Sequence, residues 1–354
     1  MNRTERKAAR GNQGEDKWTG KRRLLPEANE EKRRKRVARP EEEEEPVDLM
    51  ALVATQYRER WEWRYRRGRE PYEDATSIPP MRYTDEPPPP INRVGCADAV
   101  VVFSVKVTEL SDGLEWPLDV YGVVAARDSA DHNRNLLFNR TRDNCQTLTA
   151  EMQDASLLLT GPSRAIMKVR AVDYDVELKA KGESPSQDKL LSFFVDKNCY
   201  TPGERRQGVR CHTCSSQLST VVVMVGHLKQ TVEATMTIRV TEGSWPTRYH
   251  GRFAARISNL DDRDMVLFDS RDEAITVMSN GTIELTRRAV SVEKNGELRI
   301  LVDAWLDDGD LEVASVANGE VLFAPRRSGR SKGVCDVGFS RIEVTVVWSL
   351  VVNR

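Results

Sequence analysis

Cys211 and Cys214, in the sequence CHTC, are the residues whose type and spacing most directly suggest chemistry. Two thiolates at this spacing can bind one tetrahedral zinc ion, as in a zinc knuckle. Cys199, twelve residues earlier, and His227, thirteen residues later, would complete a set of four ligands. The sequence therefore assigns no cofactor, and zinc is the one transition metal that it suggests. The second CxxC pair that would make a zinc site a strong prediction is missing. A redox pair and an inert loop are therefore the other interpretations.

Acidic clusters in the predicted connections between strands could bind a hard cation such as Ca²⁺. They are Asp128 with Asp131, and the clusters within 261–264 and 307–310. Asp is also common in turns, which need no ion. None of the four His residues lies next to a suitable nucleophile, and the sequence has no P-loop, no dinucleotide-binding glycine motif and no HExxH. We therefore predict no catalytic residue.

The first 46 residues combine many charges with almost no apolar residues, so we expect them to be disordered. Two basic clusters in this arm have the spacing of a bipartite nuclear-import signal. They are Lys21, Arg22, Arg23 and Lys32, Arg33, Arg34, Lys35, Arg36. Alternatively, the arm binds nucleic acid through phosphate charge. Because no signal peptide or membrane span is recognisable, we expect a protein of the cytoplasm or nucleus that is not secreted.

Residues 47–68 predict one amphipathic helix with a basic face. Its apolar residues recur at every fourth position. They are Leu49, Val53, Tyr57, Trp61 and Tyr65. We expect this stripe to pack on the protein's own core, and contact with a membrane or another partner is the alternative. Proline runs then predict an extended linker that reaches residue 94.

From residue 95 onward, short runs rich in Val, Ile, Thr and aromatic residues alternate with Gly, Asp and Asn, which predicts antiparallel β-structure. WPLDVYGVVAARDSADHNRNLLFNRTRD, from Trp116, matches WPTRYHGRFAARISNLDDRDMVLFDSRD, from Trp245. This internal repeat predicts an all-β chain with two tandem related antiparallel β-sandwich-like units. We place them at 95–242 and 243–354, after the disordered charged arm (1–46) and the helix with its Pro-rich linker (47–94).

Residues present in both copies are interpreted as parts of the common frame. Trp116 and Trp245 would anchor the two cores, and Gly122 and Gly251 would permit a bulge or a close approach of strands. Polar residues that the second copy lacks are the candidates for a binding site in the first unit. They are Asp119, Asp128, Asn133, Asn135, Arg140 and Asn144.

The segments YEDATSIPPMRYTDEPPPP, LLLTGPSRAI and DVGFSRIEVTVVWSL, together with the repeated motif, resemble a plant family that is expanded in grasses, domain of unknown function 6598. The likeness covers residues 57–350. It implies no catalytic residue. Some cereal relatives resemble jasmonate-induced or ribosome-inactivating proteins that join this region to an rRNA N-glycosidase domain, and no matching helical domain is recognisable here.

Three functions are compatible with these patterns. We expect first a non-enzymatic β-sandwich interaction module that binds protein partners, and the resemblance adds a stress or defence setting. The second is a metal-dependent or hydrolytic enzyme that uses a cleft between the β units. The third is a nucleic-acid or membrane-surface binder that acts through the basic arm and the helix.

Overall fold

The computed structural model describes residues 49–65, 71–86, 94–111, 113–150, 155–196, 208–270, 275–306 and 315–352. In these ranges the chain forms one α-helix, two 3-10 turns and nineteen strands, and the paired strands are antiparallel. The all-β prediction is therefore confirmed. Residues 47–354 form one compact unit. The predicted disordered arm and its import signal lie outside the described residues.

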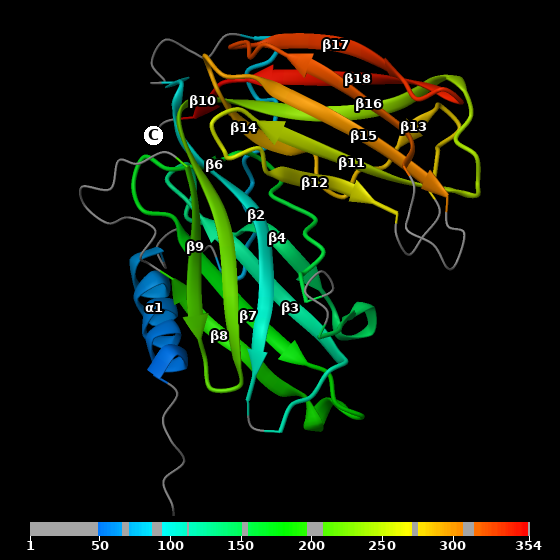
Figure 1. Cartoon of the computed structure of the whole chain (residues 1–354). Coiled ribbons are helices and arrows are strands. Elements are labelled where there is room, and N and C mark those ends of the chain that lie inside the picture. Colours follow the sequence, from blue (N-terminus) through cyan, green and yellow to red (C-terminus); the bar gives the residue numbers. More distant parts are fainter. Residues whose placement is uncertain are drawn as a thin grey trace, which may run out of the picture. The chain divides into compact units, whose positions relative to one another are not determined.

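Two sheets face each other in the first β unit (Figure 1). One sheet contains β2 (Ala97–Leu110), β6 (Ile166–Met167), β9 (Gly208–Ser215) and the first part of β10 (Ser219–Gly243). The other contains β3 (Leu118–Arg127), β4 (Asn135–Arg140), β5 (Gln146–Leu148), β7 (Asp173–Ala180) and β8 (Lys189–Asp196). The turns are η2 (Arg142–Asn144) and η3 (Pro185–Gln187). Alternate residues of both sheets, among them Val223 and Phe138, fill the core between them.

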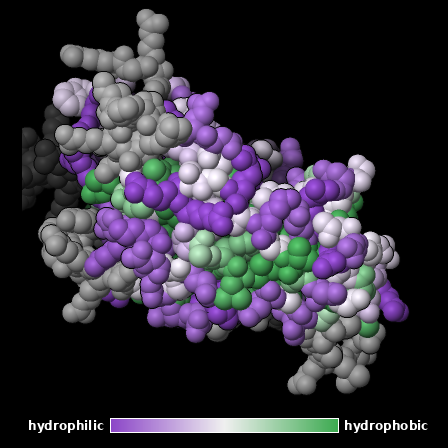
Figure 2. Space-filling model, turned by 90° about the horizontal axis from the view of Figure 1, so that it is seen from above, coloured by the Kyte–Doolittle hydropathy of each residue, from purple (hydrophilic) through white to green (hydrophobic). Residues whose placement is uncertain are grey.

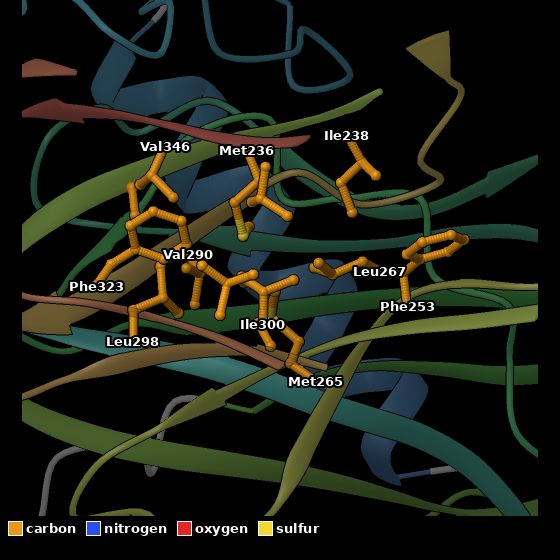
Figure 3. Packing of buried hydrophobic residues seen from close by; sticks show 14 of the residues in the cluster. Met236, Ile238, Phe253, Met265, Leu267, Val290, Leu298, Ile300, Phe323 and Val346 are labelled. Atoms are coloured by element: carbon orange, nitrogen blue, oxygen red, sulfur yellow. The ribbon is translucent and has the colours of Figure 1, made fainter. Parts of the chain in front are cut away.

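The second β unit has the same arrangement. One sheet contains the rest of β10 with β13 (Thr282–Ile283), β14 (Ala289–Glu293), β17 (Gly329–Asp336) and β18 (Ser340–Ser349). The other contains β11 (Tyr249–Ile257), β12 (Asp264–Asp269), β15 (Leu298–Leu306) and β16 (Ser315–Phe323). Figure 3 shows Met236 of β10 and Val346 of β18 on one side of this core and Leu298 and Ile300 of β15 on the other. Phe253 of β11 lies beside Leu267 of β12 at one end of the cluster.

Strand β10 belongs to both units. Residues 219–228 pair with β2 and β9, whereas residues 231–243 pair with β18, β14 and β13. The register shifts between these two stretches, and Gln230 there has a φ of 51°, which is uncommon for a residue other than glycine. Val223 faces the first core and Met236 the second. The predicted boundary at 242/243 lies at the end of β10, after its contribution to the second core.

The order of strands is the same in both units, and β10 is the strand that they share. In the first unit the opening strand β2 pairs with the closing strand β10. In the second unit the end of β10 takes the place of β2 and pairs with the closing strand β18. The facing sheets also correspond, because the order β4-β3-β7-β8 matches β12-β11-β15-β16. The single strand β10 therefore closes one unit and opens the next.

The repeated tryptophans differ in their burial. Trp245 is buried in the second core, where its indole Nε1 donates a hydrogen bond to the carbonyl oxygen of Tyr249 at 2.9 Å. Trp116 is only half-buried and packs at the margin of the first core. The anchor prediction is confirmed for Trp245 and holds only in part for Trp116.

Helix α1 (Leu49–Tyr65) packs against β8, and three of the five residues of its predicted stripe face the protein. Trp61 is buried, but 70% of Leu49 and 41% of Val53 are exposed. An α-helix turns by about 100° per residue, so a four-residue spacing drifts by about 40° at each step. The stripe that packs on the β structure is Ala54, Tyr57, Trp61 and Tyr65. The prediction was therefore wrong for Leu49 and Val53.

Residues 71–86, which we call the strap, connect with both β units. In the first unit the Thr76 amide donates to the carbonyl oxygen of Arg134 at 2.9 Å. In the second, the Thr84 hydroxyl donates to the carbonyl oxygen of Trp348 at 3.0 Å, and the Tyr83 amide donates to Ser349 Oγ at 2.9 Å. Beyond the strap, β1 (Val94–Gly95) pairs with β19 (Val351–Val352).

The repeated glycines provide a matched test of the frame. Gly122 has a φ of 127°, and a Cβ there would lie 2.2 Å from the backbone oxygen of Glu177 in β7. A Cβ on Gly251 would meet only side chains, the nearest atoms being 2.5 Å away on Ile275 and Trp245. We expect Gly122→Ala to lower the free energy of unfolding by roughly 2–4 kcal/mol, because backbone cannot move aside. Gly251→Ala should cost less, and urea titrations of both variants would contradict this reasoning if the losses were equal.

Candidate functional site

Charged side chains gather at one end of the first unit. Because neighbouring strands are antiparallel, the last residue of β3 pairs with the first residue of β7, and Tyr174 near that start pairs with Asp196, the last residue of β8. β9 begins at this end with Gly208, which pairs with His227 of β10. We call this the polar end of the first unit. It contains two groups of charged side chains, described in turn.

The first group is built around Asp175, whose side chain is almost fully buried. Its Oδ2 accepts hydrogen bonds from Arg127 Nη2 at 2.9 Å and from Arg134 Nε at 2.8 Å. The guanidinium of Arg127 lies 4.0 Å from the ring centre of Tyr72 and 5.1 Å from that of Trp61. Two cations and one carboxylate leave a positive charge, which the aromatic faces stabilise.

Helix α1 docks on this first group. The indole of Trp61 donates to the carbonyl oxygen of His132 at 3.2 Å, and the Tyr65 ring stacks on the His132 ring with centroids 3.8 Å apart. The Tyr57 hydroxyl donates to Asp173 Oδ2 at 2.7 Å, and burial together with this carboxylate raises the pKa of Tyr57. The first group therefore attaches the helix to the first unit.

Asp128, a predicted binding residue, lies inside the protein. It forms a two-point ion pair with Arg164, with Nη1 to Oδ2 at 2.6 Å and Nη2 to Oδ1 at 3.0 Å. Its Oδ2 also accepts the Met167 amide at 2.7 Å. Both side chains are nearly inaccessible to solvent. These contacts use the carboxylate to hold the backbone around residues 128–131 and 164–167.

The other predicted binding residues separate into two places. Asn135 is buried beside Arg164 and donates to its carbonyl oxygen at 3.0 Å. Asn133, two residues earlier in the chain, is also buried. Arg140 and Asn144 lie together near η2, where Arg140 Nη1 is 3.4 Å from Asn144 Oδ1. Asp119, at the start of β3, accepts the Thr147 hydroxyl at 2.6 Å. The structure therefore does not bring these six residues into one site.

The predicted zinc ligands are also not assembled among the described residues, and Cys199 lies outside them. Cys211 and Cys214 lie on the single strand β9, where positions three apart point to opposite faces and lie roughly 10 Å apart. Cys211 is exposed, whereas burial and the charge of Asp196 raise the pKa of Cys214 to about 11.

The acidic clusters form part of the fold where they are described. Asp131 Oδ2 accepts the Thr76 hydroxyl of the strap at 2.9 Å, and Asp264 pairs with Arg252 and Arg256. Residues 307–310 lie outside the described residues. Across the described part of the chain, no group of three or more His, Cys, Asp or Glu side chains is arranged to hold a metal ion.

A second group at the polar end was not predicted from the sequence. Lys168 Nζ lies 2.8 Å from His227 Nδ1, and His212 Nδ1 lies 3.3 Å from Asp196 Oδ2. Burial, followed by the charges of Lys168, His212 and Arg210, lowers the pKa of His227 to about 4. The sequence shows Arg210 and His212 at alternate positions of β9. It does not show that Lys168, from a distant part of the chain, lies beside His227.

Exposed apolar side chains concentrate on α1. Figure 2 shows an elongated hydrophobic area with hydrophilic residues around it on the face seen from above. Large apolar residues exposed in the second unit include Leu322 and Val334. The highest exposures among the described residues are nevertheless on the helix, where 82% of Trp63 and 70% of Leu49 are accessible. No helix in these ranges combines the length and apolar content needed to cross a membrane.

These features define a tandem β-sandwich protein whose two units share one strand. The chain belongs to the DUF6598 family, described as a domain of unknown function, and the family's sequence model matches residues 99–346. The family prediction is thereby confirmed. No curated protein matches the chain.

Among solved structures, the chain is similar to human GIVD cytosolic phospholipase A2, with 10% sequence identity and a TM-score of 0.23 over 72% of this chain. The same enzyme in complex with methyl gamma-linolenyl fluorophosphonate gives 10% identity and a TM-score of 0.24 over 73% of this chain. In both cases 33% of the phospholipase chain is covered, so this chain spans about a third of its length. Similarity this weak carries no argument about fold or activity.

Two of the predicted binding residues can be tested for a structural role. We expect Asp128→Ala to lower the free energy of unfolding by about 3–5 kcal/mol, because it leaves Arg164 buried without its carboxylate. Asp119→Ala, which removes one exposed hydrogen bond, should stay within about 0.5 kcal/mol of the natural protein. Chemical denaturation of both variants measures the difference, and a small loss for Asp128→Ala would return that residue to the candidates for ligand binding.

Proposed function

We propose that the protein is a non-enzymatic interaction module that binds a partner protein through the outward face of α1. The observation that carries this proposal is the presence of two apolar faces on one helix. Trp61 and Ala54 are buried against the first unit, whereas Leu49, Leu52 and Trp63 are exposed. A helix that served only to cover its own protein would need the first face alone.

The exposed apolar residues lie on the side of the helix opposite the docked face, with Gln56 and Glu59 between Leu52 and Trp63. Leu52 and Trp63 are eleven residues apart, which places them within about 20° of each other around the helix. Trp63 and the buried Ala54 are nine residues apart, or about 180°. Trp63 therefore points directly away from the protein. Exposed tryptophan is rare on a surface without a partner and is enriched where interfaces carry most of their binding energy.

The helix is held firmly on the first unit, so its outward face is preformed for recognition by a partner. Tyr57, Trp61 and Tyr65 fix its inner face through hydrogen bonds and ring stacking. Around Trp63 the exposed charges are balanced, with Arg60 and Arg64 on one side of the count and Glu59 and Glu62 on the other. The partner that fits is a protein with an apolar groove, which would receive Leu49, Leu52 and Trp63 of the helix.

The polar residues favour an interaction module over the enzyme alternative. Asp128, Asp175 and their arginines bind one another inside the protein, so their charges support the fold. A stress or defence setting, and nuclear import through the basic clusters at 21–23 and 32–36, stay predictions.

Photo-crosslinking would identify the partner. A photoreactive phenylalanine at position 63 should form an adduct with one protein in an extract of the source tissue, and the same residue at Leu158, exposed on the first unit, should not. The isolated partner should then bind the natural chain and Leu158→Gln equally. Leu52→Gln with Trp63→Gln should weaken binding by about 2 kcal/mol or more in calorimetry, because both remove buried apolar contacts.

Two outcomes would contradict the proposal. One is equal affinity of the helix variant and the Leu158→Gln control for the isolated partner. The other is co-sedimentation of the purified protein with anionic lipid vesicles that the helix variant loses, because the occupant of this face would then be a membrane.

A further inference from the structure

Four basic side chains, which we call the basic cluster, lie on one face at the polar end of the first unit. They are Lys168, Arg210, His212 and His227. We propose that the basic cluster is a binding site for a phosphate group, either free or as a phosphate monoester. The site is separate from the outward face of α1, and neither proposal depends on the other.

The register of the strands places these side chains on one face. His227 pairs with Gly208, and Arg210 pairs with Val225, so Arg210 is the diagonal neighbour of His227 on the inward side of β9 and β10. His212 is the next inward residue of β9. Lys168 follows β6, which pairs with β2 beside β10. Lys168 and Arg210 therefore flank His227, and His212 lies one inward position beyond Arg210 on the same face.

Space is available beside His227. Gly208 faces it across the strand pair, and a Cβ added to this glycine would meet no atom within 4 Å. The second unit shows what fills the same place when no site is needed. There β17 begins with Gly329, which pairs with Trp348, a fully buried residue whose indole donates to Ser331. The first unit has His227 where its copy has this tryptophan.

The hydrogen bonds leave donors directed to an anion. Lys168 Nζ donates to Nδ1 of His227 at 2.8 Å, so the ring proton of this neutral histidine is on Nε2. His212 has Nδ1 directed to Asp196, and its Nε2 is buried with no hydrogen-bond partner. A buried ring nitrogen without a partner is unfavourable, and an anion beside it would accept its hydrogen bond when it is protonated.

The charges around His227 favour an anion. Lys168 and Arg210 carry two permanent positive charges, and Asp196, at the end of β8, contributes one negative charge. On the β2 side the residue opposite His227 is Val100, which is apolar. Among these three charged groups the balance is one positive charge, to which a protonated histidine would add. Asp98, two residues from Val100 on β2, is a second carboxylate, and its Oδ1 accepts the Gln230 amide at 3.2 Å. A phosphate group suits this arrangement because it has up to two negative charges and several oxygens that accept charge-assisted hydrogen bonds.

Calorimetric titration of the full chain with inorganic phosphate and, separately, with glycerol 3-phosphate tests the site. We expect saturable binding of at least one of them. Lys168→Met and Arg210→Gln should each weaken binding about tenfold, because each removes one charge-assisted hydrogen bond. Lys181→Met is the matched control, since Lys181 lies just after β7 at the opposite end of the same unit, and its affinity should equal that of the natural chain.

NMR titration gives a readout that a purely structural role would not move. Bound phosphate favours protonated imidazole, so saturation should raise the pKa of His227 by about one unit from its low starting value. Preferential binding of glycerol 3-phosphate would identify a phosphorylated ligand, and preferential binding of inorganic phosphate would identify the free anion. Absence of binding at millimolar ligand, or equal affinities of Lys168→Met and Lys181→Met, would overturn the proposal. Should Lys168→Met fail to fold, Arg210→Gln decides.

Discussion

The shared strand β10 is the constraint on which the rest of the structure depends. Its first part supplies Val221, Val223 and Val225 to one core, and its second part supplies Ala234 and Met236 to the other. Neither sandwich is complete without β10, so the two units cannot move apart like independent domains joined by a flexible linker. Tandem domains normally meet at small polar interfaces and move relative to each other. Here the two units share one strand and also pack continuously, because Val101 and Phe103 of β2 contact the second core.

Buried polar groups reinforce this union. Arg287, between β13 and β14, donates to the backbone oxygens of Gly161 at 2.7 Å and Val102 at 2.6 Å in the first unit, and burial lowers its pKa to about 10. Glu233 of β10 accepts the amides of Met81 in the strap and Ala165 beside β6, and burial raises its pKa. Arg287 is satisfied only when the two units are together, and Glu233 only when the strap and the segment before β6 lie against β10, which favours one assembled state.

The sequence predicted the strands and their duplication because these depend on local patterns, the alternation of apolar residues and the common motif from Trp116 and Trp245. It did not predict that β10 serves both units, since the apolar alternation gives no sign of a change of partner strand at Gln230. Ion pairs such as Asp128 with Arg164 join residues far apart in sequence, so clustered Asp and Arg resembled a binding site. The basic cluster was hidden for the same reason, because Lys168 and His227 meet only in the folded chain.

The strap has a consequence for how such a repeat ends. In the first unit the outer side of the β2–β10 pair is covered by the second unit, where Leu260 lies against Gly226. In the second unit the corresponding pair is β10–β18, and the strap covers it through Glu233 and Ser349. The strap thus occupies the place that a third sandwich would take. It resembles the capping repeats of solenoid proteins, because it covers a sheet surface on which a further unit could otherwise pack by sharing a strand.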